Sequence, residues 1–304
     1  MLLEDHNSDS DGFDHSFEWR GGYCTIVRHL YDLSVTCALC LAFVGNPSMS
    51  AAPRARVTGL YRYPVKGLSA EPLQSIEIGE HETLPLDRLY ALTNGDIPFD
   101  PDAPAHLPKI RFLMLMKQEA LARLEASFDA TTHTLTIGEN GHELVSGSLR
   151  EDPGKTAIET FFSERFADQL RGAVKVVTAK GHAFTDVPEK FISLINLESL
   201  RDLETRTGLP IDPLRFRANI YVDGIPAWSE FDLLGRDLVG PRAEFKVVGR
   251  IDRCAAIEVD PATGARDIKM TRKLMDFYGH IDCGVYLDAE TAGQISIDNH
   301  LLVG

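Results

Sequence analysis

Short strand patterns dominate the sequence from Arg56 onward, and they limit the possible folds more than any other feature of the chain. Residues 57–63, 73–78 and 88–93 are rich in β-branched and aromatic side chains, and Pro, Gly or Asn residues bound these runs. Residues 134–145 are typical of a hairpin whose turn lies at Glu139-Asn140-Gly141. These runs predict a sheet or a barrel in the first half of the chain.

Two helices are predicted between these strands. Over residues 117–128 the side chains of Leu121, Leu124 and Phe128 recur at helical spacing and would share one face. Over residues 155–170 an apolar face recurs in the same way.

The second half begins after a polar stretch at residues 181–188 and is again mainly β. Asn196 is placed to cap a helix that runs to Thr207, and Gly208 is able to end it. Another helix is predicted over residues 270–278. Strands are predicted over residues 191–195, 218–222, 244–248, 255–259, 284–287 and 294–297. The fold class is therefore mainly β, with β-barrels and a few helices, in an α+β arrangement.

Residues 1–48 differ in composition from the rest of the chain. Residues 4–18 are rich in Asp, Ser and His, and the uninterrupted apolar run at residues 33–44 is too short to span a bilayer. The stretch before that run is acidic, whereas a secretory signal begins with a basic leader. We interpret residues 1–48 as a poorly ordered extension or an unused upstream start, and we expect no membrane association.

The net charge restricts the partners of the protein. Its 31 basic and 45 acidic residues give a formal charge of −14, which argues against non-specific binding to nucleic acids or anionic membranes. An anionic ligand must therefore meet a local basic pocket.

Five cysteines are too few, and odd in number, for a secreted disulfide framework. Cys37 and Cys40 have the spacing of a zinc or redox pair, but no second pair follows them. We therefore expect a reducing, cytoplasmic location.

Three clusters of basic residues could form the local basic pocket that an anionic ligand requires. Lys66, followed by Gly67 and Ser69, stands at a proline-restrained strand end and suits a phosphate or another oxyanion. Arg88 stands at the mouth of a strand, where a guanidinium can bind phosphate with two hydrogen bonds. Arg215, Arg217 and Asn219 lead into an apolar strand and would need partners there. For Lys66 the alternative is a solvated surface charge, and for Arg88 it is a surface pair with Asp87.

Cys254 is the candidate for chemistry. It follows Arg250 and Arg253, whose positive charges can stabilise the thiolate, the form of cysteine that binds soft metals or attacks electrophiles. The alternative is a small buried residue at the end of a strand. The sequence contains no phosphate-binding loop, nucleophile elbow, HExxH zinc motif or dinucleotide-binding glycine motif.

These motifs resemble a known family. Residues 63–69 with Leu86-Asp87-Arg88 resemble the N-terminal β-barrel that accompanies MOSC domains, which are named after the C-terminal domain of molybdenum cofactor sulfurase. Residues 215–220, together with Arg253-Cys254 through Gly264, resemble the MOSC domain itself. The resemblance implies a MOSC N-terminal β-barrel domain over residues 54–185 and a MOSC domain over residues 186–304.

The resemblance also implies a cofactor site. In the mitochondrial amidoxime reducing component and its bacterial relatives, the cysteine that matches Cys254 is a ligand to molybdenum. Positions that match the basic motifs and the start of the helix after Asn196 touch the phosphate and pterin of molybdopterin. The implied cofactor-binding residues are Lys66, Gly67, Arg88, Asn196, Glu198, Ser199, Arg217, Asn219 and Arg253.

Three positions depart from the pattern of these relatives. Gly67 replaces a serine that usually follows the lysine, Asp252 lies two residues before Cys254, and Glu198 stands where relatives have Ser or Thr. Two added negative charges would weaken the binding of an anionic cofactor unless they point away from it or hold the arginines in place.

The leading functional prediction is a molybdenum-dependent oxidoreductase that reduces small N-hydroxylated or N-oxide substrates, modified bases included. The sequence contains no ferredoxin-like run of cysteines, so we expect electrons to come from a separate flavin or iron-sulfur protein. One alternative is a sulfur carrier or sulfurtransferase that uses a Cys254 persulfide. Another is a non-catalytic carrier of the molybdenum cofactor. In molybdenum cofactor sulfurase the MOSC domain is fused to a pyridoxal-phosphate desulfurase. Pyridoxal phosphate binding would therefore come to this chain only by family inheritance.

Overall fold

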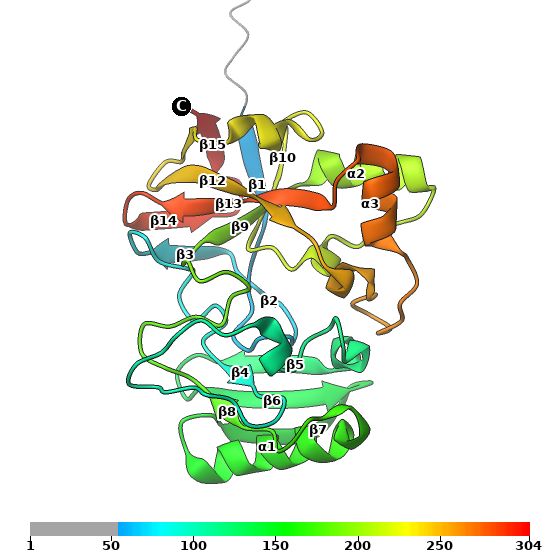
Figure 1. Ribbon diagram of the computed structural model, residues 1–304. Coiled ribbons are helices and arrows are strands. Elements are labelled where there is room, and N and C mark those ends of the chain that lie inside the picture. The colour runs from blue at the N-terminus through cyan, green and yellow to red at the C-terminus, as the bar shows by residue number, and fades with distance from the viewer. Residues whose placement is uncertain (1–53) are drawn as a thin grey trace, which may run out of the picture. The chain divides into compact units, whose positions relative to one another are not determined.

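The computed structural model describes residues 54–304, and within them seven strands form a closed barrel (Figure 1). Residues 1–48, for which an extension is predicted, lie outside the described residues. The barrel closes because β1 pairs with both β15 and β10. In order around the barrel the strands are β10 (Ile220–Asp223), β9 (Ile192–Asn196), β13 (Asp282–Ala289), β12 (Glu244–Asp252), β11 (Asp237–Val239), β15 (His300–Val303) and β1 (Arg54–Arg62).

Alternating side chains fill the barrel. In β1, Ala55 and Val57 are buried while Arg54 and Arg56 are exposed, as expected for a strand with one face toward a core. Branched and aromatic residues from the other strands, such as Phe245 of β12, complete this core. The barrel predicted from the sequence is thus confirmed, and the fold is mainly β.

A separate three-stranded sheet carries the second hydrophobic core. β5 (Glu125–Asp129), β6 (Thr134–Glu139) and β7 (His142–Ser148) are antiparallel, and α1 (Asp152–Arg165) packs on them. The predicted hairpin is confirmed, because Asn140 and Gly141 both have positive φ at the turn between β6 and β7.

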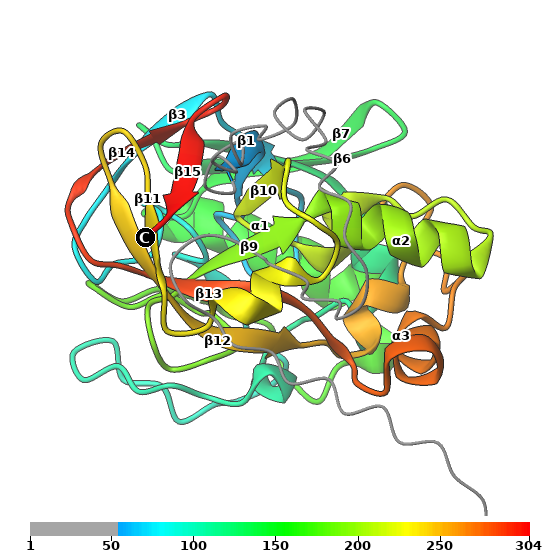
Figure 2. The same ribbon diagram turned by 90° about the horizontal axis from the view of Figure 1, so that it is seen from above.

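Two helices cover the outside of the barrel (Figure 2). β9 and β10 are parallel neighbours, so α2 (Leu197–Thr207) forms the crossover that such a pair requires. The Asn196 side chain accepts a hydrogen bond from the Glu198 amide, and Gly208 ends α2 in the left-handed conformation, as predicted. The predicted helix over residues 270–278 is α3 (Met270–Tyr278).

Two predicted elements are wrong. Residues 117–128 contain the 3₁₀ helix η2 (Glu119–Arg123) and then β5, because Leu124 has extended backbone and Phe128 pairs with Leu135 across the sheet. The apolar spacing fits a strand from Leu124 onward equally well. Residues 255–259, predicted as a strand, form the 3₁₀ helix η6 (Ala255–Glu258) directly after Cys254.

The remaining elements are short. They are β2 (Glu71–Pro72), β3 (Ser75–Ile78), β4 (Ala91–Leu92), β8 (Val176–Val177), β14 (Gly293–Ser296), and the 3₁₀ helices η1 (Lys109–Arg111), η3 (Ala167–Gln169), η4 (Pro213–Phe216) and η5 (Ser229–Leu233). None of the helices in residues 54–304 combines the length and apolar character that crossing a membrane requires.

Candidate functional site

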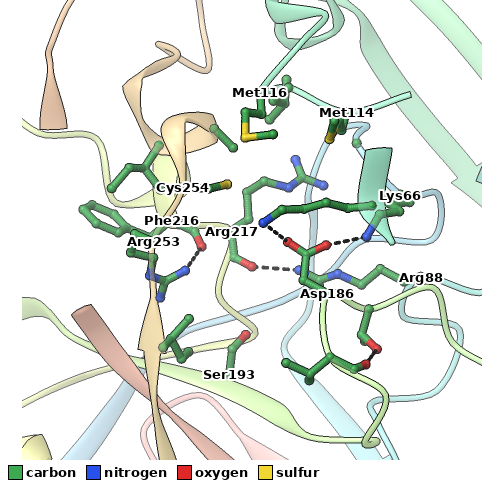
Figure 3. A pocket seen from close by; sticks show the side chains of 18 of the residues that line it. Lys66, Arg88, Met114, Met116, Asp186, Ser193, Phe216, Arg217, Arg253 and Cys254 are labelled. Atoms are coloured by element: carbon green, nitrogen blue, oxygen red, sulfur yellow. Dashed lines mark hydrogen bonds and ion pairs between the residues drawn. The ribbon is translucent and has the colours of Figure 1, made fainter. Parts of the chain in front are cut away.

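A basic pocket of about 250 Å³ lies among loops from both halves of the chain (Figure 3). Its lining contains six cationic and three acidic side chains, so its formal charge is +3 in a chain whose net charge is −14. This is the local basic pocket that the sequence requires for an anionic ligand. The cationic residues are Lys66, Arg88, Lys109, Arg215, Arg217 and Arg253, and the acidic ones are Asp87, Asp186 and Asp252.

Lys66 is held at one side of the pocket by two oxygen atoms. Its buried ammonium donates to the Phe184 carbonyl at 2.9 Å and to the Asp186 carboxylate at 2.5 Å. Burial lowers the pKa of Lys66, and the charge of Asp186 opposes that effect. Lys109, at the start of η1, contacts the other Asp186 oxygen at 3.4 Å. Two lysines from different segments therefore share one carboxylate.

Gly67 allows the chain to turn beside Lys66. Its φ of +84° is in the left-handed region, and a Cβ atom there would lie 3.0 Å from the Leu113 carbonyl oxygen. A serine at this position would be strained. The departure from the relatives' lysine-serine pair thus has a structural cause.

The Tyr63 ring supports two guanidinium groups. Arg88 lies 4.4 Å and Arg217 lies 4.3 Å from its centroid. Arg88 also donates to the Asp87 carboxylate at 2.5 Å and to the Arg217 carbonyl at 2.9 Å. The buried Asp87 carboxylate in turn accepts from the Tyr63 amide at 2.8 Å. Arg88 is therefore committed to the scaffold that positions Arg217.

Arg217 differs from its neighbours because its guanidinium makes no hydrogen bond or ion pair with any residue in the part of the chain that the structure describes. Burial lowers its pKa to about 10, the neighbouring Arg88 adds to the effect, and Tyr63 opposes it. The charges of Asp87 and Asp186 also oppose the effect, but neither carboxylate pairs with Arg217 directly. A largely buried cation without a direct ion pair is costly, and an anionic ligand would relieve that cost.

Asn219 is part of the pocket wall, but its side chain is already hydrogen-bonded. Its oxygen accepts from the Ser193 hydroxyl at 2.8 Å, and its nitrogen donates to the Tyr61 carbonyl at 3.2 Å. In this structure Asn219 joins β1, β9 and the start of β10.

Arg253 and Cys254 form the wall at the end of β12. The Arg253 guanidinium donates to the Cys283 carbonyl at 2.8 Å and to the Phe216 carbonyl at 2.9 Å. Its Nη2 atom is buried and has no partner among residues 54–304. Cys254 is half-buried and lines the pocket, whereas Cys283 is fully buried, which raises its pKa to about 12. Cys254 is thus the accessible thiol of the two.

The segment Met114-Leu115-Met116 lines the pocket together with Cys254. In Figure 3 the Cys254 thiol and the Met116 thioether point into the same part of the pocket. Arg266 fixes this arrangement, since it donates to the Ala255 carbonyl at 3.0 Å and to the Met116 carbonyl at 2.7 Å. No sequence motif marks Met116, Lys109 or Arg266, and Asp186 belongs to the polar stretch at residues 181–188, which has no site pattern of its own.

Arg215 also lines the pocket but is neutralised by ion pairs. It contacts Asp260 at 2.8 Å and Asp267 at 2.6 Å and is almost fully buried. These contacts, together with a hydrogen bond to the Glu258 carbonyl, connect η4 to the end of η6 and to the loop that follows it.

The structure does not place all of the predicted site residues together. Lys66, Gly67, Arg88, Arg217, Asn219, Arg253 and Cys254 line the pocket, whereas Asn196, Glu198 and Ser199 do not. Asn196 and Ser199 donate to the buried Glu230 carboxylate at 3.0 and 2.7 Å, and Glu198 pairs with Arg201. The carboxylate of Glu198 is therefore away from the pocket, and Asp252 is exposed at its rim.

The family model for the MOSC domain matches residues 179–301, which include Arg217, Asn219 and Cys254. Residues 179–301 form a MOSC domain. The chain is also similar to curated molybdenum cofactor sulfurases. It is 26% identical to that of Caenorhabditis briggsae and 24% identical to that of Caenorhabditis elegans, over 73% of this chain in both cases. It spans about a third of these relatives, since the matched part is 31% of each.

Two solved structures resemble the chain at lower identity. The YuaD protein from Bacillus subtilis is 14% identical with a TM-score of 0.40, over 82% of this chain and 95% of that one. YiiM from Geobacillus stearothermophilus is 20% identical with a TM-score of 0.30, over 37% of this chain and 53% of that one.

Proposed function

We propose that the protein binds the molybdenum cofactor in the basic pocket, with Cys254 as a protein ligand to the metal. The observation that carries this proposal is the Arg217 guanidinium, which has no anionic partner among the described residues and lies in the same pocket as Cys254. The Nη2 atom of Arg253, which has no hydrogen-bond partner within residues 54–304, supports it from the wall beside that cysteine. Both are donors that an anionic ligand can satisfy.

The donor set of the pocket fits this group better than it fits a bare metal ion. Within residues 54–304 no three His, Cys, Asp or Glu side chains gather into a metal-binding cluster. A metal at Cys254 would thus need most of its ligands from a non-protein group. Molybdopterin carries both sulfur ligands and a phosphate, so it matches one thiol beside several cations.

The residues of the pocket would divide the work. Arg217 and Lys66 would bind the phosphate, while Arg88 and Asp87 hold the Arg217 backbone and the Tyr63 ring in place. The bound cofactor would supply two-electron or oxygen-atom chemistry. Arg253 would fix the loop that presents Cys254 through its bonds to two carbonyl groups.

We propose further that the loaded protein is an oxidoreductase for small N-hydroxylated or N-oxide compounds, with electrons from a separate flavin or iron-sulfur protein. This assignment rests on the resemblance of residues 63–69 and 253–264 to the amidoxime-reducing proteins. Reduction of an N-hydroxylated base by the purified protein with a reconstituted donor would test it. A protein that contains molybdenum but has no such activity would refute the assignment.

A sulfur carrier is the second candidate function. Cys254 is half-buried beside cationic groups, and the curated relatives are named molybdenum cofactor sulfurases. In this case Cys254 would carry a persulfide, with the nearby positive charges stabilising its anionic form. A non-catalytic cofactor carrier would use the same contacts without turnover.

Metal analysis of the purified protein distinguishes these functions. We expect about one molybdenum per chain after expression with ample molybdate, its loss in Cys254→Ala, and its retention in the matched control Cys283→Ala. Cyanide-releasable sulfur at Cys254 without metal would favour the sulfur carrier instead. If neither molybdenum, pterin nor persulfide is found, the cofactor proposal fails.

A further inference from the structure

The carboxylate of Asp186 differs from the other two carboxylates of the pocket in how it is held. Asp87 is buried and bonded to Tyr63 and Arg88, so it belongs to the scaffold. Asp252 is exposed and makes no side-chain bond within residues 54–304. Among residues 54–304, the Asp186 carboxylate pairs only with the ammonium groups of Lys66 and Lys109, and its own side chain is 47% exposed.

The backbone around Asp186 would allow its side chain to leave. The segment is anchored at Phe184, whose amide donates to the Arg88 carbonyl at 2.8 Å and whose ring is buried against Phe112. Asp186 itself makes no backbone hydrogen bond to another described residue. Rotation of its side chain toward solvent therefore breaks no hydrogen bond or ion pair within the described part of the chain except those with the two lysines.

These two contacts are of the kind that the phosphate of a ligand would make. Lys66 is buried and lies 2.5 Å from one Asp186 oxygen, and Lys109 lies 3.4 Å from the other. A buried ammonium without a counter-charge is unfavourable, so Asp186 keeps the pocket stable when no ligand is bound. It also covers the position between the two ammonium groups.

We propose that Asp186 is an internal counter-anion that occupies the anion position between Lys66 and Lys109, and that an anionic ligand binds there by displacing it. This inference rests on the proposed function only in that the pocket receives an anionic ligand. It adds the residue that sets which anions are accepted.

Displacement makes the pocket selective for phosphate over carboxylate. A carboxylate ligand would exchange one carboxylate for another, while Asp186 has the advantage of being attached to the same chain. A phosphate monoester carries more negative charge and three acceptor oxygens, so it can contact both lysines and also Arg217. Phosphate monoesters should therefore displace Asp186, whereas simple carboxylates should not.

Titration calorimetry on the full chain, expressed in a host without molybdopterin synthesis, tests this proposal. The probes are inorganic phosphate and acetate, and the variants are Asp186→Asn and Asp252→Asn. Each variant removes one negative charge from the pocket lining, but Asp252 has no lysine partner within residues 54–304. We expect Asp186→Asn to lower the phosphate Kd by about tenfold and to permit acetate binding. We expect Asp252→Asn to change the phosphate Kd by less than about twofold, because an exposed charge is screened.

Three results would overturn the proposal. Phosphate affinity that is equal or weaker in Asp186→Asn would make Asp186 part of the binding scaffold. An equal gain in both variants would reduce the effect to net charge, and absence of phosphate binding in every form would exclude an anion position between the lysines. None of these results depends on molybdenum. If metal analysis shows no molybdenum at Cys254, the phosphate result for Asp186→Asn still holds. If Asp186→Asn binds phosphate no better than the wild type, the metal result for Cys254→Ala still holds.

Discussion

Replacement of Arg217 by methionine should make the cofactor-free protein more stable. The Arg217 pKa is lowered from its ordinary value of 12.5 to about 10, mainly by burial. At about 1.4 kcal/mol per pH unit, this difference corresponds to about 3 kcal/mol. Because the folded-state pKa is below the unfolded one, the protonated group destabilises the fold fully at pH 7, and this effect fades only as the pH rises from about 10 toward 12.5.

Methionine keeps an unbranched apolar side chain over the Tyr63 ring but removes the charge. Loss of the cation–π contact offsets about 1 kcal/mol of the gain. We therefore expect Arg217→Met to raise the free energy of unfolding by about 2 kcal/mol at pH 7, and Arg217→Lys, which retains a cation, to give no such gain.

Urea denaturation with and without inorganic phosphate measures both the stability of each variant and its stabilisation by the ligand. A ligand that binds only the folded state stabilises it, so phosphate should stabilise the wild type more than Arg217→Met, which keeps Lys66 and Lys109 but loses one phosphate contact. Stability and ligand binding would then change in opposite directions. If Arg217→Met is less stable than the wild type by more than about 1 kcal/mol, the guanidinium stabilises the fold and the argument from its burial is refuted.

Two further predictions concern the surroundings of the site. Gly284→Ala should destabilise the protein by at least about 2 kcal/mol in urea denaturation, because φ is +81° and the new Cβ would lie 2.4 Å from the Leu194 carbonyl oxygen. Gly249→Ala is its control, since open space surrounds that position; similar losses in both would contradict the steric argument. Burial raises the pKa of Glu230 above its ordinary 4.5, so its stabilising contribution is present at low pH and is lost as the pH rises through the folded-state pKa. Relative to Glu230→Gln, the wild type should lose stability as the pH rises above 4.5, and a stability difference that does not change with pH would count against a buried titrating carboxylate.

Local signals in the sequence were sufficient for much of the fold. Asn196 and Gly208 bound α2 as predicted, because capping depends on hydrogen bonds within a few residues. The helix predicted over residues 117–128 is wrong because the apolar spacing there is compatible with the period of a helix and with that of a strand. Only tertiary pairing with β6 selects the strand for Phe128.

Site residues that belong to local sequence motifs could be predicted, whereas those that depend on contacts between distant segments could not. The basic motifs and Cys254 line one pocket, as the sequence indicated. Asn196 and Ser199 instead bind Glu230, a partner more than thirty residues away that no local pattern reveals. Asp186 and Lys109 likewise meet only because two loops fold against each other, 77 residues apart in sequence.

Closure of the barrel by β1 has a consequence for how the protein can be divided. The segment matched by the family model begins at residue 179, yet β1, at residues 54–62, supplies the strand between β10 and β15. A fragment cut at the family boundary would expose the unpaired edges of both neighbours, a common cause of aggregation. It would also lose Lys66 and the Tyr63 ring beneath Arg217. Fragments for recombinant expression, and searches for fused partners of this domain, should therefore treat the strand at residues 54–62 as inseparable from it.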